Sequence, residues 1–251
     1  MAFLQCDFFS ATLALSTSMN VVLPLGEGVK RPYRTLYLLH GLSDDHTIWA
    51  RRTSIERYAD AHGVAVVMPA AGRSFYVDMA NGARYGAFFE EELPSVTRSL
   101  FPLSPRREDT FVAGLSMGGY GAFRLALRRP DLFCAAGSFS GALNMAKVVE
   151  ESDEERKAEW QRIFGDAGGV AGSDRDLFHL ADALPPAARA RLRLYQCCGT
   201  EDFLYQDNLL FRDHARRLGL DLSFSDGPGD HEWGYWDRQV KDFLDWLLKD
   251  S

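Results

Sequence analysis

The chain has 251 residues, of which 46% are hydrophobic and 25% are charged, and its formal net charge at pH 7 is −7. This length and composition are those of a globular protein with one α/β domain. The negative charge argues against nucleic acid as a partner, because phosphate binding needs a basic face, and it gives no support for docking to an anionic membrane.

The sequence of residues 1–84 predicts four strands and one long helix. Runs of apolar and β-branched residues mark the strands, at residues 3–9, 12–23, 34–39 and 64–68. We expect the first two strands to be antiparallel neighbours. Helical spacing predicts a helix over 48–61, and residues 70–84 are expected to form a loop.

From residue 85 onward, the predicted strands alternate with helices. Residues 85–101 are predicted as a helix that Pro94 kinks. The further strands are expected at 110–115, 133–139, 190–198 and 220–225, and the further helices at 117–129, 204–218 and 235–248. Such alternation predicts βαβ units, and hence an α/β fold with a mostly parallel central sheet and helices on both faces.

Residues 141–189 depart from this alternation. They are acidic over 150–155 and then glycine-rich over 168–172. We interpret the segment as an insertion or small cap above the edge of the sheet. A separate domain is disfavoured because no linker flanks the segment, so residues 1–251 are predicted to form a single domain.

Targeting signals and cysteine usage favour the cytoplasm. Asp7 interrupts the first apolar stretch, and no basic region precedes that stretch, so we predict no signal peptide. No stretch approaches the ~18 apolar residues of a membrane span. The four cysteines are too sparse for a disulfide framework and contain no Cys-x-x-Cys pair. We therefore expect a cytoplasmic protein with no membrane partner.

The strongest chemical motif is the sequence GLSMGG at residues 114–119. It contains Gly-x-Ser-x-Gly between a predicted strand and a predicted helix, which is the context in which this motif positions a serine nucleophile. A sharp turn lifts Ser116 above the sheet, and the flanking glycines let the backbone pass without a Cβ clash. The motif therefore predicts that Ser116 is the nucleophile.

A serine nucleophile needs a base, and in this arrangement the chain order is serine, acid, histidine. Of the histidines that follow Ser116, only His231 lies in a loop between a predicted strand and the last helix, so we predict that it is the base. The acid should follow the preceding strand, where Asp202 is our choice and Glu201 the alternative. Asp202 could instead cap the helix that begins nearby.

The oxyanion of the reaction needs two backbone N–H donors. We predict that one is the amide of Met117, the residue after the nucleophile, and that the other is the amide of Leu42 in the loop after residues 34–39. His40 precedes the nucleophile, and we interpret it as a residue that shapes this loop.

Three aromatic residues are candidates for substrate binding: Trp49, Tyr76 and Trp233. They fall on loops or at element edges near the predicted site, where lining a cleft and packing in the core are both open to them. The run Glu90–Glu92 is interpreted as a solvated helix face rather than a metal site, and no metal or cofactor is expected.

With these residues in hand, the chain resembles the esterase D group of α/β-hydrolases, and within it the bacterial tributyrin esterases. The resemblance rests on LYLLHGLSDDHTIW, EELP, AGLSMGGYGA, SFSGAL, CGTEDFLY and HEWGYW, which together span residues 36–236. It implies an α/β-hydrolase fold, catalytic Ser116, Asp202 and His231, and oxyanion amides at Leu42 and Met117.

The predicted function is therefore that of a serine carboxylesterase that hydrolyses small acyl esters through an acyl-enzyme, without a cofactor. A thioesterase like the S-formylglutathione hydrolases, or an acyltransferase, would use the same triad. The formylglutathione enzymes usually carry a cysteine shortly after the His-Gly-Leu sequence, where this chain has Ser43 and Asp44. A non-catalytic ligand receptor would be expected to lack a triad member. The partner is a small-molecule ester, and self-association into a homo-oligomer stays open.

Overall fold

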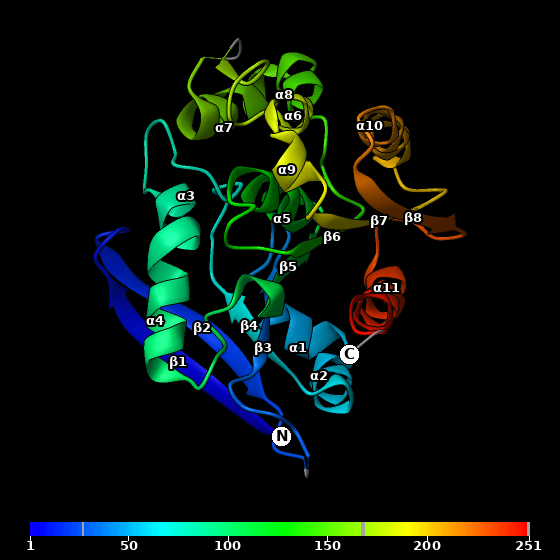
Figure 1. Cartoon of the computed structure of the whole chain (residues 1–251). Helices are drawn as coiled ribbons and strands as arrows, with labels where there is room; N and C mark the ends of the chain where they lie inside the picture. Colours follow the sequence, from blue (N-terminus) through cyan, green and yellow to red (C-terminus); the bar gives the residue numbers. More distant parts are fainter. Residues whose placement is uncertain (27, 167–168, 250–251) are drawn as a thin grey trace.

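A computed structural model describes residues 1–26, 28–166 and 169–249. Its centre is an eight-stranded sheet with the order β1-β2-β4-β3-β5-β6-β7-β8. The strands from β3 onward are parallel, and β1 and β2 join them as an antiparallel hairpin at one edge (Figure 1). The strand bounds are Ala2–Ser10, Leu15–Leu23, Arg34–Leu39, Val64–Pro69, Thr110–Leu115, Ala135–Phe139, Arg193–Gly199 and Asp221–Gly227, from β1 to β8.

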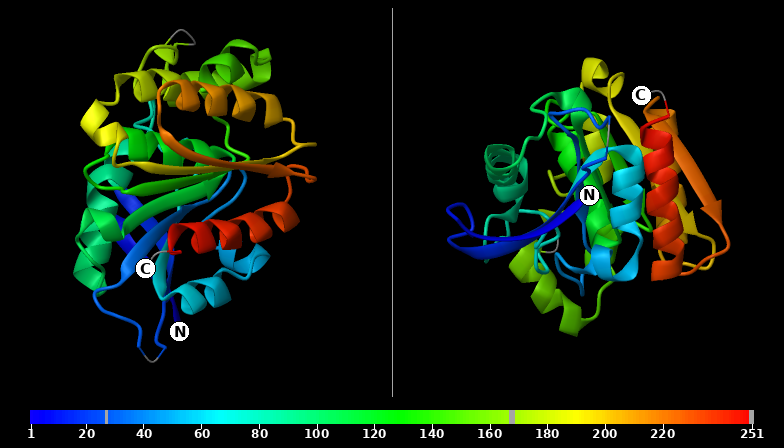
Figure 2. Two further views of the ribbon diagram at one scale, coloured as in Figure 1. Left: turned by 45° about the vertical axis from the view of Figure 1, so that its right-hand side comes forward. Right: turned by 90° about the horizontal axis from the view of Figure 1, so that it is seen from below.

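Helices cover both faces of the sheet (Figure 2). One face carries α1 (Ile48–Arg52), α2 (Ile55–His62) and α11 (Trp233–Leu247), whose apolar residues form one core cluster with the strands. The opposite face carries α5 (Met117–Arg128) and α10 (Tyr205–Arg217), which contribute to a second and larger cluster. Strands β4 and β5 are buried along their whole length, as continuous apolar runs in a parallel sheet should be. The α/β-hydrolase architecture expected from the sequence is confirmed.

The helix predicted over 48–61 is interrupted at Thr53, which is extended. The Thr53 hydroxyl donates to the carbonyl of Trp49 at 2.6 Å and accepts from the amide of Ile55 at 3.2 Å, so it ends one helix and starts the next. Short hydroxyl side chains compete with the helical backbone in this way, so this helix prediction was wrong in its continuity.

The helix predicted over 85–101 contains a wider turn than expected. After α3 (Tyr85–Ala87), residues Phe88–Glu92 form a π-helical turn, and α4 follows over Leu93–Leu100. Pro94 lies in the first turn of α4 and has no N–H for the carbonyl of Glu90, which instead accepts a hydrogen bond from Arg129 at 2.9 Å. A π turn therefore accompanies the predicted kink.

The acidic run on this helix is not simply a solvated face, which corrects the interpretation from the sequence. Glu92 accepts hydrogen bonds from the Ser10 hydroxyl and the amides of Ala11 and Thr12, at 2.6, 2.8 and 3.0 Å, and so holds the turn between β1 and β2. Glu90 pairs with Arg124 at 3.3 Å and with Arg128 on α5. The run therefore connects the edge hairpin and α5 through this helix.

The described part of segment 141–189 forms four helices above α5, at the top of Figure 1: α6 (Met145–Glu150), α7 (Glu154–Phe164), α8 (Leu177–Ala183) and α9 (Pro186–Arg189). Residues 167–168, within its glycine-rich part, lie outside the described residues. Its buried residues, such as Trp160, belong to the same core cluster as α5. The assignment of residues 1–251 to a single domain with an insertion stays a prediction. No helix in the described part of the chain is long and apolar enough to cross a membrane.

Candidate active site

Ser116 lies at the junction of β5 and α5 with φ 51° and ψ −115°. This positive φ is unfavourable for a residue with a Cβ atom, so the surrounding packing has to enforce it. A Cβ at Gly118 would lie 2.5 Å from the carbonyl oxygen of Leu39, and one at Gly114 would lie 2.6 Å from the backbone of Gly118. Only glycine at these two positions lets α5 begin directly over β3 and β5, which forces the tight turn at Ser116.

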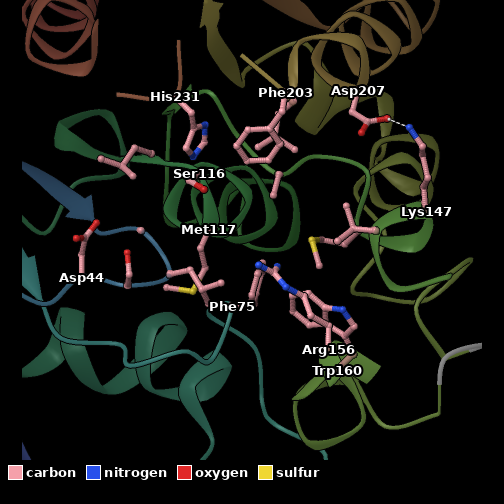
Figure 3. A pocket seen from close by; sticks show the side chains of 18 of the residues that line it. Asp44, Phe75, Ser116, Met117, Lys147, Arg156, Trp160, Phe203, Asp207 and His231 are labelled. Atoms are coloured by element: carbon pink, nitrogen blue, oxygen red, sulfur yellow. Dashed lines mark hydrogen bonds and ion pairs between the residues drawn. The ribbon is translucent and has the colours of Figure 1, made fainter. Parts of the chain in front are cut away.

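His231 lies in the loop between β8 and α11, and its Nδ1 is 2.8 Å from Oδ2 of Asp202. The start of α11 fixes this loop, because the Glu232 carboxylate accepts hydrogen bonds from the amides of Gly234 and Tyr235, both at 2.6 Å. Figure 3 shows the imidazole of His231 above the hydroxyl of Ser116, and both side chains line one cleft. The three residues that the sequence singled out therefore come together.

Asp202 serves two partners at once. Its Oδ1 accepts a hydrogen bond from the amide of Leu204 at 2.8 Å, so it caps the turn into α10, while its Oδ2 faces His231. The capping contact that the sequence left open is therefore present, and the same carboxylate also contacts His231. Burial of this carboxyl raises its pKa, but the hydrogen bonds from His231 and the Leu204 amide outweigh burial and hold the pKa below its ordinary value. Asp202 is therefore a carboxylate at neutral pH.

Glu201, the alternative acid, points elsewhere. Its carboxylate accepts hydrogen bonds from the amide of Gly229 at 2.6 Å and from the hydroxyl of Thr200 at 2.7 Å. The hydrogen bond from the Gly229 amide is the main reason that the pKa of Glu201 lies below its ordinary value. Glu201 therefore holds the loop after β8 in place, and the carboxylate that bonds to His231 is that of Asp202.

The loop after β3 lies beside Ser116 and is held in place by two hydrogen bonds of the His40 ring. Nε2 of His40 accepts a hydrogen bond from the amide of Ala71 at 3.0 Å, so the proton resides on Nδ1, which donates to the carbonyl of Gly41 at 2.7 Å. Burial lowers the pKa of His40, which keeps its ring neutral. This arrangement is consistent with the loop-shaping role expected for His40.

The two amides predicted to bind the oxyanion border the cleft, since Leu42 and Met117 both line it. Among the described residues, neither of these amides has a hydrogen-bond acceptor. Met117 is the first residue of α5, where an N–H is left without a partner in the helix. Both groups are therefore available to a ligand.

Two of the three predicted substrate-binding aromatics lie in the core, which is a correction. Trp49 and Tyr76 are fully buried and do not line the cleft. The Trp49 Nε1–H donates to the carbonyl of Leu39 at 3.0 Å, and the Tyr76 hydroxyl donates to the carbonyl of His40 at 2.8 Å. These bonds draw both rings beneath the loop after β3. The third residue, Trp233, does line the cleft.

The cleft has a volume of about 530 Å³ and is built largely from residues that the sequence analysis did not single out. The ring of Phe203 packs against that of His231 at an interplanar angle of 48°, with centroids 4.7 Å apart, although 74% of its surface is exposed. Its position directly after Asp202 was a usable signal. The insertion contributes a further set, whose members the sequence did not identify individually: Met145, Lys147, Val148, Glu151, Arg156 and Trp160. Within the described residues, no group of three or more His, Cys, Asp or Glu side chains is placed to hold a metal ion.

Comparison with known proteins agrees with this geometry. A family model described as "Putative esterase" matches residues 10–247. An acetyl esterase of Caldicellulosiruptor saccharolyticus is 32% identical, and the match covers 100% of both chains. The fluorophosphonate-binding serine hydrolase F of Staphylococcus aureus is 37% identical, with a TM-score of 0.90 and 99% of each chain covered. An S-formylglutathione hydrolase from the same organism is also 37% identical, with a TM-score of 0.86 and 98% of each chain covered. The chain therefore belongs to the esterase family, in its esterase D-like group of α/β-hydrolases, and it is a serine carboxylesterase.

Proposed function

We propose that the enzyme hydrolyses short-chain acyl esters through an acyl-enzyme formed on Ser116, with His231 as general base and Asp202 as the residue that orients it. The observation that carries this assignment is the 2.8 Å contact between Nδ1 of His231 and Oδ2 of Asp202, in a cleft that also exposes Ser116 at a strained turn. Asp202 is ionised and therefore accepts a hydrogen bond from the Nδ1–H of His231, which leaves the lone pair of Nε2 free to accept a proton from Ser116.

The proposed reaction has two acyl-transfer steps. In the first, His231 takes the proton of Ser116 as the hydroxyl oxygen attacks the ester carbonyl carbon, and the imidazolium then gives that proton to the departing alkoxide. In the second, water loses a proton to His231 and attacks the acyl-serine, which releases the carboxylic acid and restores the hydroxyl of Ser116. In both steps the free amides of Leu42 and Met117 stabilise the oxyanion of the tetrahedral intermediate.

A fluorophosphonate probe is expected to label this chain at one residue, Ser116, because only a serine activated by a base attacks phosphorus readily. The relative described as a fluorophosphonate-binding serine hydrolase supports this expectation. Mass spectrometry of the labelled peptide checks the position, and activity should persist in the presence of a chelator. Inhibition by a chelator with recovery on adding metal would instead indicate metal-assisted hydrolysis.

For p-nitrophenyl esters, kcat/KM is expected to be highest between acetate and butyrate and to fall steeply by octanoate. Each methylene buried in the cleft contributes up to ~0.8 kcal/mol. A chain that exceeds the cleft has to displace packed aromatic side chains, which costs roughly 1–3 kcal/mol. Phe75 and Trp160 are such side chains, since both line the cleft and are nearly fully buried, with ring centroids 5.2 Å apart. A kcat/KM that rises continuously to palmitate would contradict this proposal and indicate a lipase.

The relative described as an S-formylglutathione hydrolase makes thioester hydrolysis the second candidate activity. The same triad would serve, since only the leaving group changes from an alcohol to a thiol. Acyl transfer to an alcohol or thiol acceptor would also use it. A butyryl thioester compared with the matched oxygen ester, with and without an added acceptor, separates these activities from hydrolysis of oxygen esters.

A further inference from the structure

Besides His231, five charged side chains line the cleft: the carboxylates of Asp44, Glu151 and Asp207, and the cations of Lys147 and Arg156. Lys147 is neutralised, because its ammonium group lies 3.2 Å from the carboxylate of Asp207 across the cleft (Figure 3). Arg156 also lines the cleft, but no carboxylate in the described part of the chain lies within ion-pair distance of its guanidinium. Arg156 is therefore the unpaired permanent cation of the cleft.

Three of the carboxylates that lie near Arg156 in the sequence already have other partners. Glu154 pairs with Lys157 at 2.5 Å, and Glu159 pairs with Arg73 at 2.5 Å. Asp153 uses its Oδ1 to accept the backbone amide of Arg156 at 2.9 Å, as the N-cap of the helix. The helix thus leaves the guanidinium of Arg156 without a partner of its own.

The position of Arg156 on α7 turns its side chain toward the cleft. It lies four residues before Trp160, so the two residues share one face of the helix. Trp160 is buried against Phe75 and lines the cleft, which identifies this face as the inner one. Figure 3 shows the Arg156 side chain reaching from α7 into the cleft beside these two rings.

An unpaired guanidinium in a cleft affects which substrate binds well. Arg156 is exposed in the free enzyme, and a neutral chain that packs against its guanidinium removes water and offers no partner in return, which is unfavourable. A carboxylate restores the lost hydrogen bonds and can pair with the planar guanidinium through two parallel bonds. The net charge of −7 disfavours anions, and so do Asp44 and Glu151 in the cleft lining, so this preference has to come from Arg156 itself.

We propose that Arg156 is a specificity-determining residue and that the esters preferred by this enzyme carry a carboxylate. The proposal rests on the esterase activity proposed above and extends it to the class of substrate. The carboxylate belongs either to the acyl part or to the alcohol part of the ester, since both parts extend from Ser116 into the same cleft.

Two matched pairs of alkyl esters test the proposal and separate the two parts. The acyl pair is monoethyl glutarate and its neutral isostere, in which an isopropyl group replaces the carboxylate. The alcohol pair is the acetate ester of a hydroxybutanoate and the matching acetate with an isopropyl group. We expect an effect in the pair whose carboxylate reaches Arg156. In that pair, Arg156→Gln should lower the preference for the anionic ester, measured as its kcat/KM divided by that of the neutral ester, by about five- to tenfold. The loss should come mainly from a higher KM for the anionic ester.

The control is Lys157→Gln, which removes the same charge from the same helix. Lys157 is half exposed, pairs with Glu154 and does not line the cleft, so the ratio should stay as in the wild type. Arg156→Glu should invert the preference, and melting temperatures check that each variant is folded. A ratio that Arg156→Gln leaves unchanged in both pairs overturns the proposal and shows Arg156 to be a solvated surface residue. If the wild type cleaves none of the four esters and no p-nitrophenyl ester, the proposed esterase activity itself fails.

Discussion

Replacing Ser116 with alanine is expected to lower kcat by roughly 10⁴- to 10⁶-fold, because the nucleophile and its base act as one unit. The fold should survive, since alanine keeps the Cβ atom and the surrounding glycines impose the same φ on it. His231→Ala should cost a similar factor, and the double variant little more. Steady-state kinetics on p-nitrophenyl acetate measures the loss, and the melting temperature checks the fold.

Ser138→Ala is the matched control for the nucleophile. Ser138 pairs with Gly114 on the neighbouring strand, so it lies close to the same turn, but it is fully buried. Its hydroxyl has no hydrogen-bond partner in the described part of the chain, so its removal should cost little stability. This variant should keep activity and fluorophosphonate labelling. If Ser116→Ala retained activity within tenfold of the wild type, Ser116 would not be the nucleophile.

The second large effect is expected for Asp202→Asn, which should lower kcat by about 10³- to 10⁴-fold. Asparagine keeps an oxygen that can accept the Leu204 amide, so the turn into α10 is preserved. Its NH₂ group would then face Nδ1 of His231 and donate to it, which places the imidazole proton on Nε2. In that tautomer Nε2 cannot accept the proton of Ser116, so the base is disabled while the geometry remains.

Glu201→Gln is the control for the carboxylate, because it removes a neighbouring negative charge of the same loop. Its amide oxygen can still accept the amide of Gly229, so the loop after β8 should hold and the loss of kcat should be far smaller. Kinetics on both variants, with folding checked by circular dichroism, gives the order. A greater loss in Glu201→Gln than in Asp202→Asn would move the acid function to Glu201.

The sequence by itself predicted the sheet and the position of the serine. Strands β3 and β5 were predicted with their bounds, because continuous apolar runs that end in glycine-containing turns leave few other structures open. The tight turn at Ser116 was predictable for the same reason, since its glycines and the flanking strand and helix are all local features. The loop after β8 placed His231 at the carboxyl edge of the sheet, where parallel strands bring their following loops together.

Only the tertiary structure decided which side chain of each loop faces the cleft. Asp202 and Glu201 are neighbours of the same chemistry, and the cap on Leu204 turns one toward His231 while the amide of Gly229 holds the other away. In the sequence, Trp49 and Trp233 were equally good candidates for substrate binding. In the structure Trp49 is buried, and its Nε1–H donates to the carbonyl of Leu39.

The sequence also could not identify which residues of the insertion line the cleft. Arg156 and Trp160 reach the cleft only because α7 packs onto residues far away in the chain. Local patterns determine where strands, helices and turns form. The direction of a side chain at the site depends on hydrogen bonds and packing between distant segments, and no local pattern encodes these.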